Sequence, residues 1–139
     1  MKTNPVERHT AFQLLVFAVL LFTMLSLSSC GRLPETSFRQ EVVGGEPDRA
    51  SNAFQEYGCI ACHRIPGVPR AQALVAPPLD DWADRRYIAG QFANTPENLI
   101  QWIMFPQELS PGSAMPDMGV TEADARDMAA YLFTLRRGR

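Results

Sequence analysis

Apolar residues recur at helical spacing in three segments of the chain, and the first is bounded by proline and glycine. It begins near Pro47, which suits the first turn of a helix, and it ends at Gly58. Between these limits, apolar side chains stand at positions i, i+3, i+4 and i+7, namely Ala50, Ala53, Phe54 and Tyr57. This spacing places the four side chains on one face and predicts an amphipathic helix.

The second segment carries clear start and stop signals. Thr95 is a suitable N-cap, Pro96 suits the first helical position, and Pro106 requires the helix to end before it. The apolar residues between these limits are Leu99, Ile100, Trp102, Ile103 and Met104. We therefore predict a second helix that begins after Thr95.

The third segment begins at Thr121, and Asp124 follows three residues later as a variant of the capping box. Its apolar stripe consists of Ala125, Met128, Ala129, Leu132 and Leu135. Arg136 and Arg137 are expected in the last turn, where positive charge suits the helix dipole. Because no segment shows a convincing alternation of apolar and polar residues, the predicted fold is all-α.

An apolar run over residues 11–27 precedes these helices and follows a short start that contains Lys2 and Arg8. The run closes with Leu27-Ser28-Ser29-Cys30, which resembles a bacterial lipoprotein box. We therefore predict that residues 1–29 are a lipoprotein-type signal peptide and that Cys30 carries the lipid. The alternatives are an uncleaved anchor helix, since about 17 apolar residues is the lower limit for a span, and a soluble secreted protein.

The segment that follows is rich in proline, glycine and polar residues. We interpret residues 30–45 as the lipidated cysteine and a flexible tether, and residues 46–139 as the folded domain. The alternative is an ordered arm in which Phe38, Val42 and Val43 dock on the domain. With either kind of anchor, the domain is expected in the periplasm or on the outer face of the cytoplasmic membrane.

Cys59-Ile60-Ala61-Cys62-His63 is the attachment signature of a c-type haem. The two thiols add to the two vinyl groups of the haem, and the adjacent histidine binds the iron. The alternatives are a disulfide and half of a zinc site, but zinc needs two further ligands and no Cys or His follows His63. The three cysteines then comprise one lipid site and two haem sites, which leaves none for a structural disulfide.

Charge narrows the range of partners. The chain carries 13 Lys plus Arg against 15 Asp plus Glu, so its formal net charge is −2. No basic stripe is present, and the sequence therefore gives no indication of nucleic-acid binding. The acidic balance bears on solubility and on the choice of partner, and it says nothing about the fold.

The sixth ligand of the iron can be narrowed by exclusion. His63 is the only histidine after Cys30, and this part of the chain contains no lysine, so methionine is the natural ligand. The candidates are Met104, Met115, Met118 and Met128.

Two of these methionines lie in helical patterns and two lie in a loop. Met104 and Met128 belong to the predicted helices, where a core role is expected. Met115 and Met118 belong to a Pro/Gly-rich loop, which can lie across a haem face and present a thioether. Because Pro116 restricts Met115 to an extended conformation, we predict Met115 as the ligand and keep Met118 as the alternative.

Five segments in order resemble the class I cytochrome c family, over nearly the whole predicted domain. The quoted segments are Tyr57-Gly58-Cys59-x-x-Cys62-His63-x-Ile65-Pro66-Gly67, Pro77-Pro78-Leu79, Asn94-Thr95-Pro96-Glu97-Asn98-Leu99-x-x-Trp102-Ile103, Pro111-Gly112-x-x-Met115-Pro116 and Ala129-Ala130-Tyr131-Leu132. The chain looks most like the cytochrome c domains fused to subunit II of haem–copper oxidases and like membrane-anchored cytochromes c. It departs from many members at Ala76, where they have glycine.

This resemblance implies roles for the matched residues around the haem. Cys59 and Cys62 would form the thioethers, His63 and Met115 would be the two axial ligands, and the Pro66 carbonyl would accept the other ring N–H of the histidine.

The resemblance also suggests partners for the haem propionates and a contact between helices. Trp102, Tyr87 and either Arg85 or Arg86 would bind the propionates, of which we favour Arg86; the alternatives are a core role for the tryptophan and solvated charges for the arginines. Phe54 is expected to meet Tyr131 or Leu132 where the first and last helices cross.

The function implied is one-electron transfer in a respiratory chain, without enzymatic activity of its own and without a small-molecule substrate. One covalently bound haem c would have no open iron position. The expected partners are a terminal haem–copper oxidase, a quinol-oxidising complex or a dehydrogenase. The alternatives are a fixed relay subunit of a larger complex and, less favoured, a haem sensor or peroxidase.

Overall fold

The computed structural model describes residues 13–22 and 40–138, and the chain divides into two compact units, 1–37 and 38–139. In the first unit, residues 13–22 form a helix whose side chains are all exposed. Within the described ranges, no helix combines the length and the apolar character that crossing a membrane requires. The predicted cleavage site and Cys30 lie outside the described residues.

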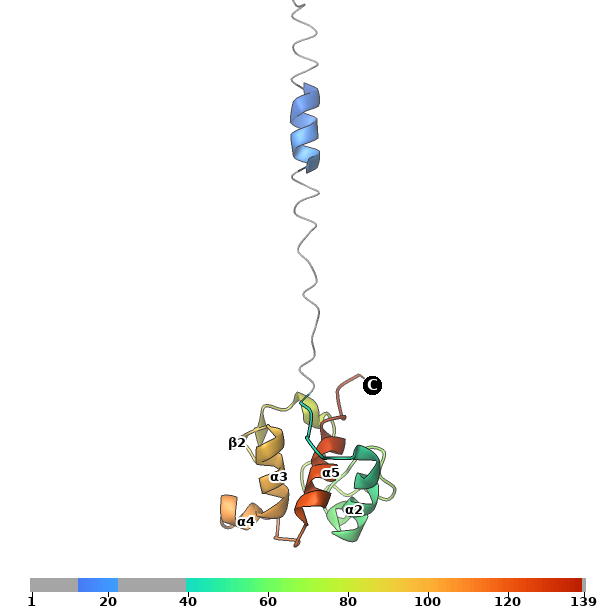
Figure 1. Ribbon diagram of the computed structural model, residues 1–139, viewed down its shortest axis with the longest axis vertical. Helices are drawn as coiled ribbons and strands as arrows, with labels where there is room; N and C mark the ends of the chain where they lie inside the picture. The colour runs from blue at the N-terminus through green and yellow to red at the C-terminus, as the bar shows by residue number, and fades with distance from the viewer. Residues whose placement is uncertain (1–12, 23–39, 139) are drawn as a thin grey trace, which may run out of the picture. The chain divides into compact units, whose positions relative to one another are not determined.

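The second unit is built mainly from helices (Figure 1). In chain order its elements are the 3-10 helix η1 (Pro47–Arg49), α2 (Ala50–Glu56), the 3-10 helices η2 (Cys59–Ala61) and η3 (Trp82–Asp84), the strands β1 (Tyr87–Ile88) and β2 (Phe92–Ala93), and the helices α3 (Pro96–Met104), α4 (Pro106–Leu109) and α5 (Glu122–Leu132). The two strands pair antiparallel, with Ile88 opposite Phe92. Apart from this small hairpin, the prediction of a helical domain is confirmed.

The predicted caps of α3 and α5 are present. Thr95 accepts a hydrogen bond from the Asn98 amide at 3.3 Å, and Thr121 accepts one from the Asp124 amide at 3.2 Å. The Thr121 hydroxyl also donates to the Asp124 carboxylate at 2.6 Å, whereas the Thr121 amide donates to the Tyr57 hydroxyl at 3.5 Å, so the reciprocal backbone bond of the predicted capping box goes to Tyr57 instead. The sequence analysis missed α4, in which Pro106 both stops α3 and begins a new helical turn.

The predicted end of the last helix is corrected, because α5 stops at Leu132 and the two arginines lie beyond it. There the chain turns back to η3, and the Ala83 amide donates to the Leu135 carbonyl at 3.0 Å. Arg136 approaches the Asp84 carboxylate at 3.8 Å, and the Arg137 amide donates to the same carboxylate at 2.7 Å. These residues therefore tie the C-terminus to η3 and do not complement the dipole of α5.

Helix α5 is the central element of the core, and it packs against α2, α3 and η1 (Figure 1). Phe54 on α2 meets Tyr131 on α5 edge to face, with ring centroids 5.8 Å apart. The predicted crossing of the first and last helices is thereby confirmed. Met128 on α5 is fully buried, as expected for a core methionine.

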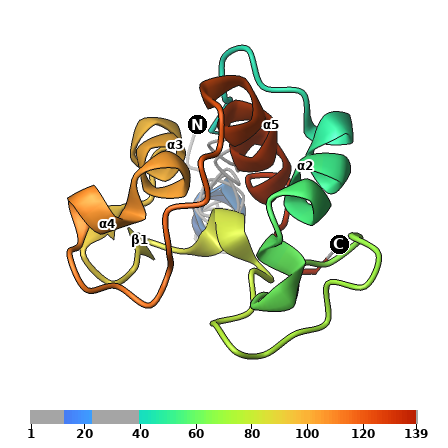
Figure 2. The same ribbon diagram turned by 90° about the horizontal axis from the view of Figure 1, so that it is seen from below.

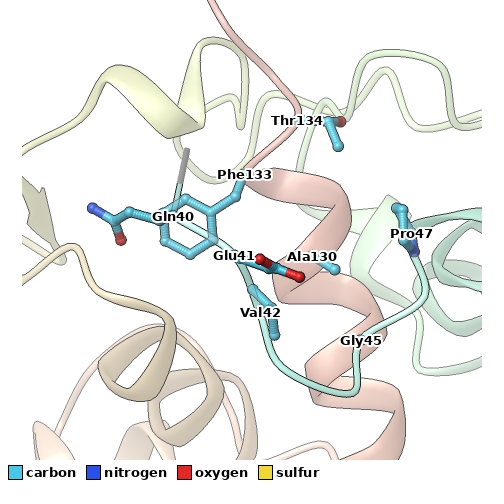
Figure 3. Close-up of a pocket in the computed structure, with 8 residues that line it drawn as sticks. All are labelled: Gln40, Glu41, Val42, Gly45, Pro47, Ala130, Phe133 and Thr134. Carbon is cyan, nitrogen blue, oxygen red and sulfur yellow. The ribbon is translucent and has the colours of Figure 1, made fainter. Parts of the chain in front are cut away.

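Residues 40–45 form an ordered arm along α5 (Figure 3). Val42 is buried, and Arg126 donates to the Val43 carbonyl at 2.9 Å. A side chain at Gly45 would collide with the Arg126 carbonyl, so the close approach requires glycine. Residues 40–45 thus form an arm in place of the predicted tether, but of the three residues in the ordered-arm alternative only Val42 is buried, because Val43 is 79% exposed and Phe38 lies outside the described residues.

The arm leads into an ion pair between the exposed Arg49 and the buried Asp127, which joins the start of the domain to its last helix. The Asp127 carboxylate on α5 accepts two hydrogen bonds from Arg49, at 2.7 and 3.0 Å, and one from the Glu46 amide at 2.7 Å. The Asp127 side chain is 4% exposed, whereas that of Arg49 is 63% exposed. The pKa of Asp127 is lowered, mainly because Arg49 donates to its carboxylate.

Replacing Asp127 with asparagine is expected to destabilise the domain by about 1–2 kcal/mol at neutral pH, because buried charge-assisted bonds are lost and the exposed arginine is partly screened. The pKa of Asp127 is lower in the folded state than in the unfolded chain, where a carboxyl has a pKa of about 4. The stabilisation by the Asp127 carboxylate is therefore complete above that unfolded-state pKa and is lost as the pH falls below it. The native-minus-variant difference in unfolding free energy should therefore shrink between about pH 5 and pH 3. The control is Glu122→Gln, which removes an exposed pair on the same helix. This role would be contradicted if both variants lost the same unfolding free energy, or if the difference between native protein and Asp127→Asn did not change with pH.

Candidate haem-binding site

The Cys59–His63 segment forms a tight turn directly after α2. Gly58 adopts the left-handed conformation, with φ of 71°, and thereby lets the chain leave α2 and enter η2. The His63 amide donates to the Cys59 carbonyl at 3.0 Å and closes the turn. Both thiols are half-buried and form no disulfide. Burial raises the pKa of the Cys59 thiol.

The imidazole of His63 is oriented by the Pro77 carbonyl, which lies 2.8 Å from Nδ1. A carbonyl can only accept, so Nδ1 carries the proton and Nε2 is left for a metal. Pro77 reaches the His63 ring because the chain just before it runs back along the Cys59–His63 turn. The Ala76 amide there donates to the Cys62 carbonyl at 2.9 Å.

The predicted role of Pro66 as the histidine's acceptor is wrong. The Pro66 carbonyl accepts a hydrogen bond from the Tyr131 hydroxyl at 2.5 Å. Gly67 has a φ of 80°, and a side chain there would collide with the same hydroxyl. Pro66 therefore ties this loop to α5, while the ring partner comes from Pro77. The signal for Pro77 was present in the Pro77-Pro78-Leu79 segment of the family resemblance.

The four candidate methionines occupy different environments. Met128 is fully buried within the core, and Met104 is half-buried on α3. Met115 is half-buried and packs against the hydrophobic core from the loop, whereas Met118 is 41% exposed. The loop methionine that faces the core is thus Met115, the residue predicted as the axial ligand.

One buried polar atom near the turn lacks a partner. The indole N–H of Trp82 is buried, and no described residue accepts its hydrogen bond. The Arg85 guanidinium lies over the same indole, 4.9 Å from the ring centroid, and burial lowers its pKa. It also donates to the Asp80 carbonyl at 3.0 Å and to the Pro78 carbonyl. A propionate of a bound haem would supply the missing acceptor for Trp82.

The other predicted propionate partners differ in burial and packing. Trp102 is buried on α3, with its ring 6.0 Å from that of Phe92, so it contributes to the core. Tyr87 on β1 is 61% exposed, and the adjacent Arg86 is also exposed. The structure thus brings Trp82 and Arg85 together beside the Pro77–Asp80 segment. The sequence analysis did not single out Trp82, although it follows Pro77-Pro78-Leu79 by three residues.

These residues fit a c-type haem. Two half-buried thiols, an imidazole whose Nε2 is available and a half-buried thioether are groups that such a haem would use, and the unpaired indole N–H of Trp82 would be available to a propionate. In the described parts of the chain, no cluster of three or more His, Cys, Asp or Glu side chains is arranged to hold a metal ion. The zinc alternative therefore gains no further ligands from the structure.

The arrangement of helices and the haem-attachment turn define the class of protein as a c-type cytochrome. Residues 48–136 match the family described as "Cytochrome c". The chain belongs to this family, and the resemblance to class I c-type cytochromes is confirmed. Membership implies a helical cytochrome c fold and a covalently bound haem c.

The chain is also similar to named proteins from three bacteria. It is 34% identical over 90 residues to cytochrome c oxidase subunit 2 of Alkalihalophilus pseudofirmus, covering 64% of this chain and 25% of that protein. Proteins of the same name are 30% identical over 102 residues in Bacillus sp. (70% and 29% covered) and 31% identical over 80 residues in Bacillus subtilis (56% and 22%). The chain thus matches only about a quarter of the length of each of these relatives.

Proposed function

We propose that this chain is a membrane-tethered cytochrome with one haem c that transfers single electrons in a respiratory chain and delivers them to a terminal haem–copper oxidase. The observation that carries the proposal is the orientation of His63, whose Nδ1 is engaged by the Pro77 carbonyl, in a chain whose core-facing loop presents Met115. When bound, the haem supplies a reversible one-electron change between ferrous and ferric iron.

The protein's own residues decide what this cofactor can do. His63 and Met115 would both ligate the iron, and with both bound no position would be left for a substrate or for oxygen. Thioether ligation favours the reduced state and raises the reduction potential. Cys59 and Cys62 hold the cofactor covalently, which keeps it in place through every redox cycle. The chain therefore acts as an electron carrier and not as an enzyme in itself.

Trp82 and Arg85 are the residues best placed to hold a propionate. The Trp82 indole would donate to it and would gain the acceptor that it lacks among the described residues. The Arg85 guanidinium, stacked on that indole, contributes a fixed positive charge. This proposal stands beside the predicted roles of Trp102, Tyr87 and Arg86, and Arg85 is one of the two arginines that the family resemblance suggests.

The oxidase is proposed as a partner because the relatives are named as oxidase subunits. In those proteins the similar segment is part of a longer subunit, which favours a second candidate function for this chain: a fixed haem relay within a larger complex. The two candidates differ in whether the domain leaves its partner between electron transfers.

Attachment to the membrane is proposed from the sequence. A lipid on Cys30 follows from the Leu27-Ser28-Ser29-Cys30 pattern, and it places the domain in the periplasm or on the outer face of the cytoplasmic membrane. Anchoring would confine the haem to a thin layer above the membrane and raise its effective concentration toward a membrane-bound oxidase.

Native separation of detergent-solubilised membranes, followed by staining for covalent haem, tests this proposal. A haem band near the size of the monomer indicates a tethered carrier, and co-migration with an oxidase at fixed stoichiometry indicates a relay subunit. Cys30→Ala should release the haem-stained chain from the membrane if the lipid anchors it. Retention of that variant would overturn lipid anchoring, and absence of covalent haem would overturn the whole proposal.

A further inference from the structure

Gln107 lies in the short helix α4, at the point where the chain leaves the helical core and enters the methionine loop. We use this name for residues 110–119, which connect α4 to the start of α5 (Figure 2). Gln107 follows the buried Pro106, and its own side chain is half-buried. Its base is therefore rigid, while the loop beyond it is mostly exposed.

The side chain of Gln107 binds the loop backbone at three points. Its amide nitrogen Nε2 donates to the Ser113 carbonyl at 2.7 Å and to the Met115 carbonyl at 2.6 Å. Its Oε1 accepts from the Gly112 amide at 3.3 Å. The backbone amide of Gln107 adds a fourth bond, to the Asp117 carboxylate at 3.1 Å. One residue thus contacts the loop before, at and after Met115.

The loop has little else to hold its shape. Pro111 and Pro116 have no amide hydrogen to donate. Among the described residues, the backbone–backbone bonds of turns and loops include one within the methionine loop, from the Ser113 amide to the Ser110 carbonyl at 3.0 Å. The Met115 amide donates to the Ser113 hydroxyl at 3.2 Å, and the Met115 carbonyl accepts from Gln107. The backbone of Met115 is therefore held on both its amide side and its carbonyl side.

We propose that Gln107 is a positioning residue that keeps the methionine loop closed, so that the Met115 thioether stays in the axial position. This inference rests on the proposed function, because it takes Met115 as the ligand. Gln107 acts through the bonds of its side chain to the loop backbone and so affects the thioether indirectly. Its amide donors are essential to the role, because the atoms that they bind are carbonyl oxygens.

The inference predicts how strongly an external ligand competes with Met115. Imidazole can bind ferric iron only in the fraction of molecules whose loop is open, so its apparent affinity reports the opening equilibrium. Loss of the bonds from Gln107 should raise the open fraction roughly tenfold, since one or two hydrogen bonds of ordinary strength correspond to about one factor of ten.

The experiment uses the holoprotein and imidazole as the probe. Gln107→Ala should bind imidazole about tenfold more tightly than the native protein. Gln107→Glu keeps the chain length and the acceptor for Gly112 but lacks the donors, so it should show at least the same effect. The matched control is Gln91→Ala, because Gln91 is exposed and its side chain donates to the Ser110 hydroxyl, at 3.3 Å, at the start of the loop. This control should leave the affinity within twofold of native.

Two further readouts separate positioning from general destabilisation and from failure of the proposed function. The charge-transfer absorption of the ferric iron–thioether bond should weaken in both Gln107 variants, while the thermal unfolding midpoint should change little. If native protein shows that absorption and Met115→Ala abolishes it, but the Gln107 variants keep native imidazole affinity, the inference is overturned and the function stands. If native protein lacks the absorption altogether, the proposed ligation fails first.

Discussion

Replacing Met115 with alanine is expected to lower the reduction potential and to open the sixth position of the iron. The thioether is the ligand that favours ferrous iron, and axial ligands as a group tune haem potentials over a range of about 0.8 V. Loss of this ligand should therefore shift the potential downward by a sizeable part of that range, on the order of 0.1 V or more. The reduced variant should bind carbon monoxide, whereas the reduced native protein should not.

Met118→Ala is the matched control for this prediction, because Met118 lies three residues further along the same loop and is 41% exposed. Its potential and its inertness to carbon monoxide should match those of the native protein. The opposite result, with the large change in Met118→Ala, would assign the ligand to Met118. Carbon monoxide binding by the reduced native protein would instead favour the sensor or peroxidase alternative.

Replacing both Cys59 and Cys62 with alanine is expected to abolish covalent haem attachment. The two thiols stand on one tight turn, and no other cysteine is described within the domain. Without thioethers, the haem would be held only by axial ligation and packing, and it should dissociate when the protein is unfolded. Staining for haem on a denaturing gel should therefore fall to background, although native helices such as α3 and α5 should still form when haem is supplied.

Single variants give an internal control for attachment. Cys59→Ala and Cys62→Ala should each retain one thioether, so haem should survive denaturation in reduced yield, with the absorption of an unreacted vinyl group. Haem that remains covalently bound in the double variant would show that attachment occurs elsewhere in the chain, and the assignment of the Cys59–His63 turn would then be wrong.

The sequence predicted the helices that bury a continuous apolar stripe and carry their own start signals. Thr95 and Thr121 form their caps through contacts only three residues away, so local chemistry was sufficient. The crossing of α2 and α5 at Phe54 and Tyr131 came from the family resemblance, and the ring contact confirms it.

The errors concern contacts that depend on how distant segments return to one another. Pro66 and Pro77 are both prolines near the haem motif, and only the folding of the 64–79 loop decides which carbonyl reaches His63. The arm over residues 40–45 has a tether-like composition, but its fit against α5 depends on the close approach at Gly45. Such pairings leave no periodic signal in the sequence.

Trp82 and Gln107 were overlooked for a related reason. A lone tryptophan in a loop indicates a core role, and its unpaired N–H is visible only once the surrounding acceptors are placed. From the sequence, a glutamine after Pro106 is expected to be an exposed polar residue. Its three side-chain bonds to the methionine loop become visible only in the folded chain.

The central claim, one covalently bound haem with His63 and Met115 as axial ligands, is tested most directly by a redox titration of the purified protein together with its mass after denaturation. The account predicts a mass one haem above that of the variant with both Cys59 and Cys62 replaced by alanine, one transition with the slope of a one-electron couple, and iron–thioether absorption in the ferric state. A mass equal to that of the double variant, or a ferric protein without that absorption, would contradict it.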